Sequence, residues 1–307
     1  MAETILQKIG GIFSRQPQDT SILFFSDLHT GGTTSLHPNV KLVDGEHRLL
    51  DEIGGWRYVN NNHYYLNSRQ VEIWGHYEKC LDYAKQQRRD KKALMISTGD
   101  AIEGDHHGTF ELATHSITEQ INTHIELMEY TQKRIDFQAG DKIIYLDGTK
   151  THVGDEEQSI GARLNAHKFP GGRYSAAFIA LEVNGALLWI YHKGKTAGNH
   201  PNRGQAAANM LKQLWYQCLF EDERPPDIVI SGHVHDPHHA VWSTPKGNIM
   251  HYLILPSWQD KTRFARDNMP TSINKVGMQV INISASGGID IPLPVLLKNK
   301  FAEVVKI

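Results

Sequence analysis

Short apolar runs alternate with longer amphipathic segments along most of the chain. The runs are rich in β-branched and aromatic residues, which is typical of buried strands. They cover residues 22–25, 93–96, 143–146, 187–191, 228–230, 252–255 and 278–283. The longer segments carry apolar residues at three- and four-residue spacing and predict helices over 69–88, 117–135, 155–166 and 205–220. Strands that alternate with helices in this way predict an α/β class.

The spacing of the predicted elements changes after residue 174, where strand runs lie closer together and helices become rarer. We therefore expect a second, more antiparallel sheet. The chain of 307 residues is long enough for one large α/β domain. We predict a single domain over 21–307, preceded by an extension over 1–20. Within that extension Ile5, Ile9 and Phe13 suggest a short amphipathic helix on the domain edge.

The segment 30–67 fits neither the strand nor the helix pattern. It places Trp56, Tyr64 and Tyr65 among glycine and asparagine residues. A loop of this length inside a compact domain is usually functional or disordered. We predict an ordered, lid-like insertion beside the first motif. Its aromatic side chains either pack within the lid or stack on a nucleic-acid base.

Composition narrows the class of protein. The net charge of -2 argues against a nonspecific nucleic-acid coat, although an enzyme that acts on nucleic acid needs only a positive cleft. An apolar run of 18 residues is absent, which predicts no membrane span, and the N-terminus does not resemble a signal peptide. Cys80 and Cys218, the only cysteines, cannot build a cysteine-based zinc site and favour buried thiols in the cytoplasm. The 18 histidines instead suggest imidazole metal ligands.

Acidic and histidine residues follow the first two apolar runs. Asp27 and His29 come after the run at 22–25. Residues i and i+2 of a strand share a face, so these two side chains can bind one ion from one side. Asp100 follows a turn that contains Gly99, and a carboxylate there can bridge two ions.

Histidines follow two later runs. His192 ends the run at 187–191, and His233 and His235 follow Gly232 directly after another run. A lone histidine at a strand end is more often structural, but the Gly-His-x-His pattern directs two imidazoles one way. An α/β sheet gathers its active-site loops at the carboxyl ends of its strands, where all these residues fall.

Two further acids, Glu103 and Asp105, lie close behind Asp100. One interpretation is that they orient the metal-binding histidines through hydrogen bonds. The other is that they are solvated loop charges. The sequence leaves both interpretations open.

Taken in order, these pieces resemble the calcineurin-like metallophosphoesterase superfamily, whose motifs are Asp-x-His, Gly-Asp-x-x-Asp/Glu, Gly-Asn-His, His and Gly-His-x-His. The resemblance spans about residues 22–258, looks most like phage and archaeal members and implies a two-sheet β-sandwich flanked by helices. It also implies two divalent metal ions, with Mn favoured and Zn, Fe or Ni compatible with the same ligands. One ion would take Asp27, His29, Asp100 and His235. The other would take Asp100, a residue of the third motif, His192 and His233.

The third motif departs from the superfamily pattern. Where the family has Gly-Asn-His, this chain has Gly148-Thr149-Lys150-Thr151-His152. Thr149 could offer its hydroxyl as the metal ligand in place of the asparagine carbonyl, but a neutral hydroxyl is a poor ligand. Water or Asp147 could substitute, and the second metal would bind more weakly. We predict that His152 contacts the scissile phosphate and either protonates the leaving oxygen or stabilises charge on it. The alternative is a loop histidine that only packs.

The resemblance predicts a phosphoesterase that cleaves a phosphodiester of a nucleotide or nucleic acid through a hydroxide bridging the metals, with Asp100 and His152 as catalytic residues. Cationic loop residues predicted either to contact the substrate or to remain solvated are Lys193, Lys195, Arg203 and Arg263. The same motifs also serve a phosphomonoesterase or phosphoprotein phosphatase. A non-catalytic metal-binding scaffold is a further alternative. We expect a phosphate-ester substrate and no membrane partner, and the sequence does not define the oligomeric state.

Overall fold

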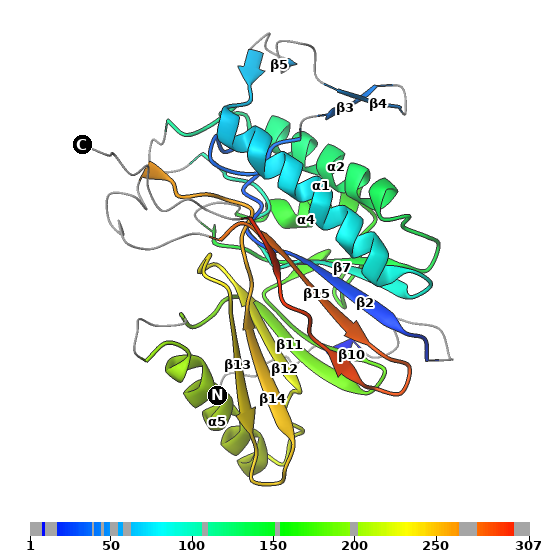
Figure 1. The fold of residues 1–307 in the computed structure, drawn as a ribbon, viewed down its shortest axis with the longest axis vertical. Coiled ribbons are helices and arrows are strands. Elements are labelled where there is room, and N and C mark those ends of the chain that lie inside the picture. Colours follow the sequence, from blue (N-terminus) through cyan, green and yellow to red (C-terminus); the bar gives the residue numbers. More distant parts are fainter. Residues whose placement is uncertain are drawn as a thin grey trace, which may run out of the picture.

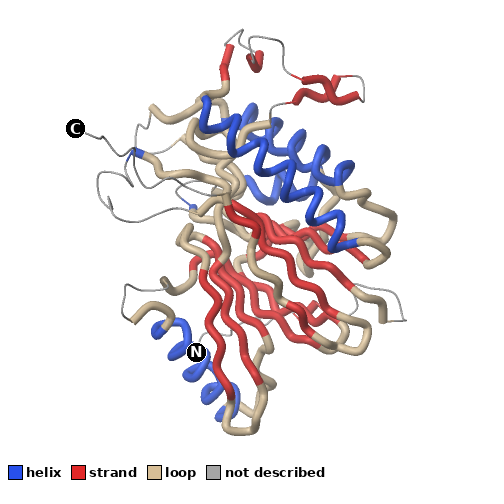
Figure 2. The backbone as a smooth tube through the Cα atoms, viewed as in Figure 1, coloured by secondary structure: helices blue, strands red, loops and turns tan. Residues whose placement is uncertain are grey.

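Two β-sheets face each other, and helices cover their outer faces (Figures 1 and 2). The computed structural model describes residues 8–9, 17–38, 40–43, 46–49, 55–57, 63–105, 110–150, 154–196, 202–263 and 275–297. The predicted apolar runs lie in strands, except that the run at 252–255 extends one residue beyond its strand, and each predicted helical segment coincides with a helix. The predicted α/β fold, two sheets flanked by helices, is thus confirmed.

The first sheet contains six strands. In the order β1-β10-β11-β12-β14-β13 they cover Lys8–Ile9, Phe178–Val183, Ala186–Lys193, Ile228–Gly232, Ile249–Ile254 and His238–Ser243. Strands β11, β12 and β14 are parallel, whereas β10 and β13 pair antiparallel with β11 and β14. The sheet is therefore mixed and less antiparallel than predicted. The cause is a helix between β11 and β12, because a helical crossover joins parallel strands.

The second sheet contains seven strands. In the order β16-β15-β2-β7-β8-β9, with β17 paired to β15, they cover Ile289–Asp290, Gly277–Ile283, Thr20–Phe25, Lys92–Ser97, Lys142–Leu146, Ser175–Ala176 and Val295–Leu296. Strands β2, β7 and β8 are parallel, so their carboxyl ends meet at one edge. All positions of β2 are buried, which explains its continuous apolar run.

Side chains alternate between two cores along each central strand. Ile22 and Phe24 pack between the sheets, whereas Leu23 and Phe25 point to the helices on the outer face. The helices on that side are α1, α2 and α4, which cover Ser68–Arg88, Ile117–Arg134 and Glu156–Arg163. Helix α5, Gln205–Phe220, covers the opposite face of the first sheet (Figure 1). None of the helices in the described ranges is long and apolar enough to cross a lipid bilayer.

The N-terminal extension contributes a short strand. Lys8–Ile9 pairs in parallel with Ala180 and Leu181 of β10, so these two residues are not part of the predicted amphipathic helix. A two-residue strand has no periodic signal of its own, and its pairing partner lies far along the chain. The positions of Ile5 and Phe13 fall outside the described residues.

The insertion after the first motif forms two hairpins. Their strands β3, β4, β5 and β6 cover Val40–Val43, Glu46–Leu49, Gly55–Arg57 and His63–Tyr65. Tyr64 donates a hydrogen bond to Gln70 of α1, and its ring lies 5.3 Å from that of His37. Tyr64 therefore packs against the start of α1 rather than presenting a free ring. For Trp56 only the backbone is described, so the role predicted for its side chain lies outside the described part of the structure.

The start of α1 is tied to the loop that follows the first motif. Asn67 and Gln70 form a reciprocal capping box, which satisfies free amide groups of the first turn. Asn67 also donates to the carbonyl of Thr33 at 2.7 Å. Gln70 donates to the carbonyls of Gly32 and Ser35. The helix that packs on the second sheet thereby anchors the loop that leaves β2.

Candidate metal centre

The candidate ligands share an unusual backbone conformation. Ten non-glycine residues in the described part of the chain have a positive φ angle. Five of them are Asp27, His29, Asp100, His233 and His235, with φ between 46° and 70°. Left-handed backbone is unfavourable for such residues and is retained mainly where function or packing requires it. All five follow the carboxyl ends of β2, β7 or β12.

Backbone hydrogen bonds hold these loops together. The Asp27 amide donates to the carbonyl of Gly99 at 3.2 Å, and the His29 amide donates to the carbonyl of Asp100 at 2.9 Å. The His233 amide donates to Oδ2 of Asp27 at 2.9 Å. The amide of the fully buried Trp258 also donates to the carbonyl of Asp27. Three strand ends are thus fixed around the Asp27 carboxylate.

The side chains form two groups that share Asp27. In each group the potential ligand atoms lie within 4.8 Å of one another. The groups consist of Asp27, His29 and His235, and of Asp27, Asp100, His192 and His233. His233 and His235 therefore face different groups. The strand rule that predicted one direction for both does not apply, because β12 ends at Gly232 and both residues have left-handed backbone.

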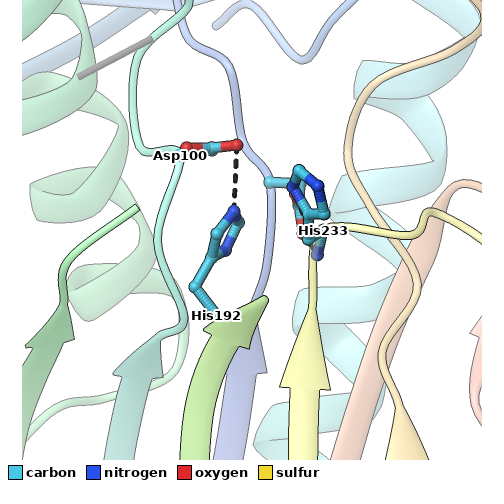
Figure 3. Close-up of side chains that lie close together, drawn as sticks. Asp100, His192 and His233 are labelled. Carbon is cyan, nitrogen blue, oxygen red and sulfur yellow. Dashed lines mark hydrogen bonds and ion pairs between the residues drawn. The ribbon is translucent and has the colours of Figure 1, made fainter. Parts of the chain in front are cut away.

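Asp100 lies between the two groups. Its Oδ2 atom is 3.1 Å from Nε2 of His192, the contact drawn in Figure 3. The same oxygen is 3.8 Å from Nε2 of His29, which belongs to the other group. Oδ1 of Asp27 lies 3.1 Å from Nε2 of His235. Asp27 thus belongs to both groups, whereas Asp100 belongs to one group and faces an imidazole of the other.

Two of the four rings, those of His29 and His192, are oriented by contacts of their Nδ1 atoms. His29 places Nδ1 at 3.1 Å from Oε2 of Glu103, and Gln259 donates to that same oxygen at 2.6 Å. His192 donates from Nδ1 to the carbonyl of Thr98 at 2.8 Å. A carbonyl only accepts, so Nε2 of His192 is left to face the centre. Of the two open interpretations, Glu103 thus orients a histidine, whereas Asp105 is exposed and pairs with His115.

The acids and histidines of the centre shift one another's pKa values so that the charged forms of both are favoured. Burial lowers the pKa of His29, but Glu103, Asp100 and Asp27 outweigh it and raise that pKa to about 9. Burial likewise lowers the pKa of His192, but the hydrogen bond to Asp100 and the nearby acids raise it to about 9. Burial raises the pKa of Asp27 and of Asp100, yet the neighbouring histidines hold both pKa values below the usual range.

We expect divalent-cation binding to strengthen as pH rises from about 6 to about 8. A histidine must lose its proton to bind a metal, and the pKa values of His29 and His192 are about 9 in the metal-free fold. Each proton displaced contributes up to about tenfold in affinity per pH unit. Calorimetric titration with Mn²⁺ in buffers of different ionisation enthalpy measures both the affinity and the protons released.

The sign of the stability effect in the metal-free protein is opposite. The pKa values of both histidines are raised above the ordinary 6.5. Their contribution is complete below about pH 6.5 and is lost as pH rises through about 9. The melting temperature in EDTA should fall over that interval. Metal affinity that is flat or falls from pH 6 to 8 would contradict this assignment of the protonated imidazoles.

The third motif reaches the centre through Thr149. Its hydroxyl donates to Oδ2 of Asp100 at 3.0 Å and lies 3.2 Å from Nε2 of His192. Its amide donates to Oδ1 of Asp100 at 2.6 Å. Thr149 therefore holds both oxygens of Asp100. The predicted catalytic His152 lies outside the described residues.

The four predicted substrate-contacting cations differ in their surroundings. Lys193 directly follows His192 and is exposed, and Lys195 is exposed two residues further on. Arg203 forms an ion pair with Asp236 at 2.7 Å, which offsets its charge. Arg263 is exposed, and its amide donates to the carboxylate of Glu111 at 2.8 Å. The two lysines are therefore the cations closest along the chain to a candidate ligand.

Sequence reasoning missed two residues beside the centre. Gln259 fixes Glu103, and only the folded loop after β14 reveals that contact. Glu157 is 1% exposed and lies in the first turn of α4. In a sequence, an acid at that position indicates only a favourable interaction with the helix dipole. Burial, followed by the charge of Asp100, raises the pKa of Glu157 to about 8. Neither residue carries a motif that could have singled it out.

No family model matches the sequence, and no curated protein matches it. A conserved, predicted phosphoesterase from Streptococcus pneumoniae is similar in structure, with a TM-score of 0.32 and 11% identity over 87% of this chain and 84% of that one. The zinc complex of Vps29 from Entamoeba histolytica has a TM-score of 0.37 and 10% identity over 90% and 99% of the two chains. The NAD nucleotidase of Haemophilus influenzae has a TM-score of 0.35 and 12% identity over 90% of this chain and 49% of that one. This chain thus spans about half the length of the nucleotidase. Because all three TM-scores are low, the functional argument rests on the geometry of the metal centre and not on these similarities.

Proposed function

We propose that this chain is a metal-dependent phosphoesterase that hydrolyses phosphodiesters of nucleotides or nucleic acids. The observation that carries the proposal is the convergence of Asp27 and Asp100 with four histidines in two adjoining groups. Carboxylate and imidazole ligands in two adjoining sites are typical of two-metal phosphoester hydrolases. The left-handed backbone of five of these six residues supports a functional role.

The donor set fits divalent cations. Asp27 and Asp100 are each 1% exposed, and their described ion pairs are all with histidines. Buried carboxylates are costly unless a counter-charge or hydrogen bonds offset them. One cation would be held by Asp27, His29 and His235, and the other by Asp27, Asp100, His192 and His233. Bound cations supply charge neutralisation for phosphate oxygens and acidify water, and these ligands suit Mn, Zn, Fe or Ni.

The protein's own part is to hold the ligands in place before substrate arrives. Glu103 and the Thr98 carbonyl fix the rings of His29 and His192, and the His233 amide fixes the carboxylate of Asp27. Pre-set donors of this kind avoid reorganisation during the reaction. Our prediction that His152 protonates the leaving oxygen remains a prediction.

A phosphodiester is favoured over a monoester by the surroundings of the centre. Lys193 and Lys195 extend an exposed positive stretch away from His192, which suits a substrate with a second phosphate or a continuing backbone. The overall charge of -2 means that such attraction has to be local. A phosphomonoesterase or phosphoprotein phosphatase would require only the metal centre. The neutral Thr149 at the third motif is the feature that would suit a non-catalytic scaffold.

We expect the Mn-loaded protein to hydrolyse bis(p-nitrophenyl) phosphate faster than p-nitrophenyl phosphate. Release of nitrophenol measures both rates, with metal content determined on the same sample. A preference for the monoester would support the phosphomonoesterase instead. Absence of turnover of either compound, with metal demonstrably bound, would contradict the enzyme and favour the scaffold.

A further inference from the structure

Besides Asp27, Asp100 and Glu103, a fourth buried acid, Glu157, lies next to the candidate metal centre. Glu157 lies in the first turn of α4, and its Oε1 atom approaches the space next to the Cα atom of Gly148. Oδ1 of Asp100 borders the same space: a Cβ atom on Gly148 would lie closer than 3.0 Å to both oxygens. Oδ2 of Asp100 faces His192 instead. Glu157 therefore approaches Asp100 from the side of Oδ1.

Glu157 has no counter-charge in the described structure. Neither of its oxygens accepts a hydrogen bond of normal geometry from the described residues. The charged groups that act on it are both acids, Asp100 and Asp147. Its own amide and that of Ala101 act in the opposite direction and favour the ionised form, but burial and the two acids outweigh them. A carboxylate that is 1% exposed and surrounded in this way is costly unless a positive charge lies close by.

We propose that Glu157 is an outer carboxylate of the metal centre, and that its negative charge strengthens cation binding at the group formed by Asp27, Asp100, His192 and His233. This inference rests on the proposed function. The bound cation balances the charge of Glu157 across the Asp100 carboxylate. Glu157 thereby supplies attraction at the point where Thr149 offers only a neutral hydroxyl. Outer groups of this kind tune a metal site without touching the ion.

The test compares Glu157→Gln with Glu156→Gln. Both variants replace one carboxyl group in the first turn of α4 with an amide, but Glu156 is half-buried rather than fully buried. Calorimetric titration with Mn²⁺ measures affinity, and melting in EDTA measures the stability of the metal-free fold. Glu157→Gln should weaken Mn²⁺ binding by about 10- to 100-fold, whereas Glu156→Gln should change it by less than about threefold. Metal-free Glu157→Gln should melt at the same or a higher temperature, because no positive group among the described residues balances this buried carboxyl group.

Two results would overturn the role of Glu157. One is equal Mn²⁺ affinity in the wild type and Glu157→Gln. The other is a lower melting temperature of metal-free Glu157→Gln, which would show that the protein itself already balances the carboxylate. Glu157→Asp keeps the charge and should retain affinity within about tenfold, which guards against a folding defect of the glutamine variant. A wild-type chain that binds no divalent cation would instead overturn the metal centre and with it the proposed function.

Discussion

Replacing Asp100 with asparagine is expected to lower the proposed phosphodiester turnover by about a thousandfold, which corresponds to ~4 kcal/mol of lost transition-state stabilisation. Oδ2 of Asp100 lies 3.1 Å from His192 of its own ligand group and 3.8 Å from His29 of the other group, so its charge acts on both. Asparagine keeps the shape of the side chain but removes the negative charge that would attract a divalent cation to this group. The measurement is Mn-dependent hydrolysis of bis(p-nitrophenyl) phosphate, accompanied by the Mn²⁺ affinity.

The matched control for this variant is Asp105→Asn. Asp105 lies five residues further along the same loop, is exposed and pairs only with His115 among the contacts described. Its substitution should leave turnover within about twofold, because exposed ion pairs contribute little. If Asp100→Asn kept more than about a tenth of wild-type turnover, Asp100 would not be a metal ligand that the reaction requires.

The layers of the fold were predictable because strands and helix faces that are buried have apolar sequences. Strands β2 and β7 lie between two cores, so both of their faces are apolar and the run is continuous. Strand β13, at the edge of its sheet, alternates in burial and includes His238, His239 and Trp242, and its pattern did not predict a strand. The strand β1 forms only by pairing with β10. Elements defined by their partners rather than by their own burial carry no local signal.

The candidate site was predictable in its members but not in its geometry. Residue type and position after a strand singled out Asp27, Asp100 and His235, and the structure brings them together. The alternation rule of strands failed beyond the strand ends, where positive φ angles turn His233 and His235 toward different groups. The contacts that orient the ligands, such as Gln259 to Glu103, join residues more than a hundred positions apart. Such pairs follow from tertiary packing, which a single sequence does not display.

Replacing Gly148 with alanine is expected to lower turnover by about a hundredfold and to destabilise the fold by about 1–3 kcal/mol. A Cβ atom at this position would overlap the backbone nitrogen of Asp100 and its Oδ1 atom and would press on Oε1 of Glu157. Backbone cannot move aside as the end of a flexible side chain can, so the loop that carries Thr149 has to shift away from Asp100. That shift breaks the hydrogen bond from the Thr149 amide, which fixes the carboxylate.

The same substitution at Gly75 separates this steric effect from a general intolerance of alanine. Gly75 lies within α1, and a Cβ atom there would meet nothing within 4 Å. Gly75→Ala should therefore stabilise the protein by about 0.5–1 kcal/mol through helix propensity and leave turnover unchanged. Thermal unfolding and Mn-dependent hydrolysis of both variants decide the matter. Wild-type turnover in Gly148→Ala would mean that the third motif does not hold Asp100, and the centre would then depend on the loops after β2, β7 and β12 alone.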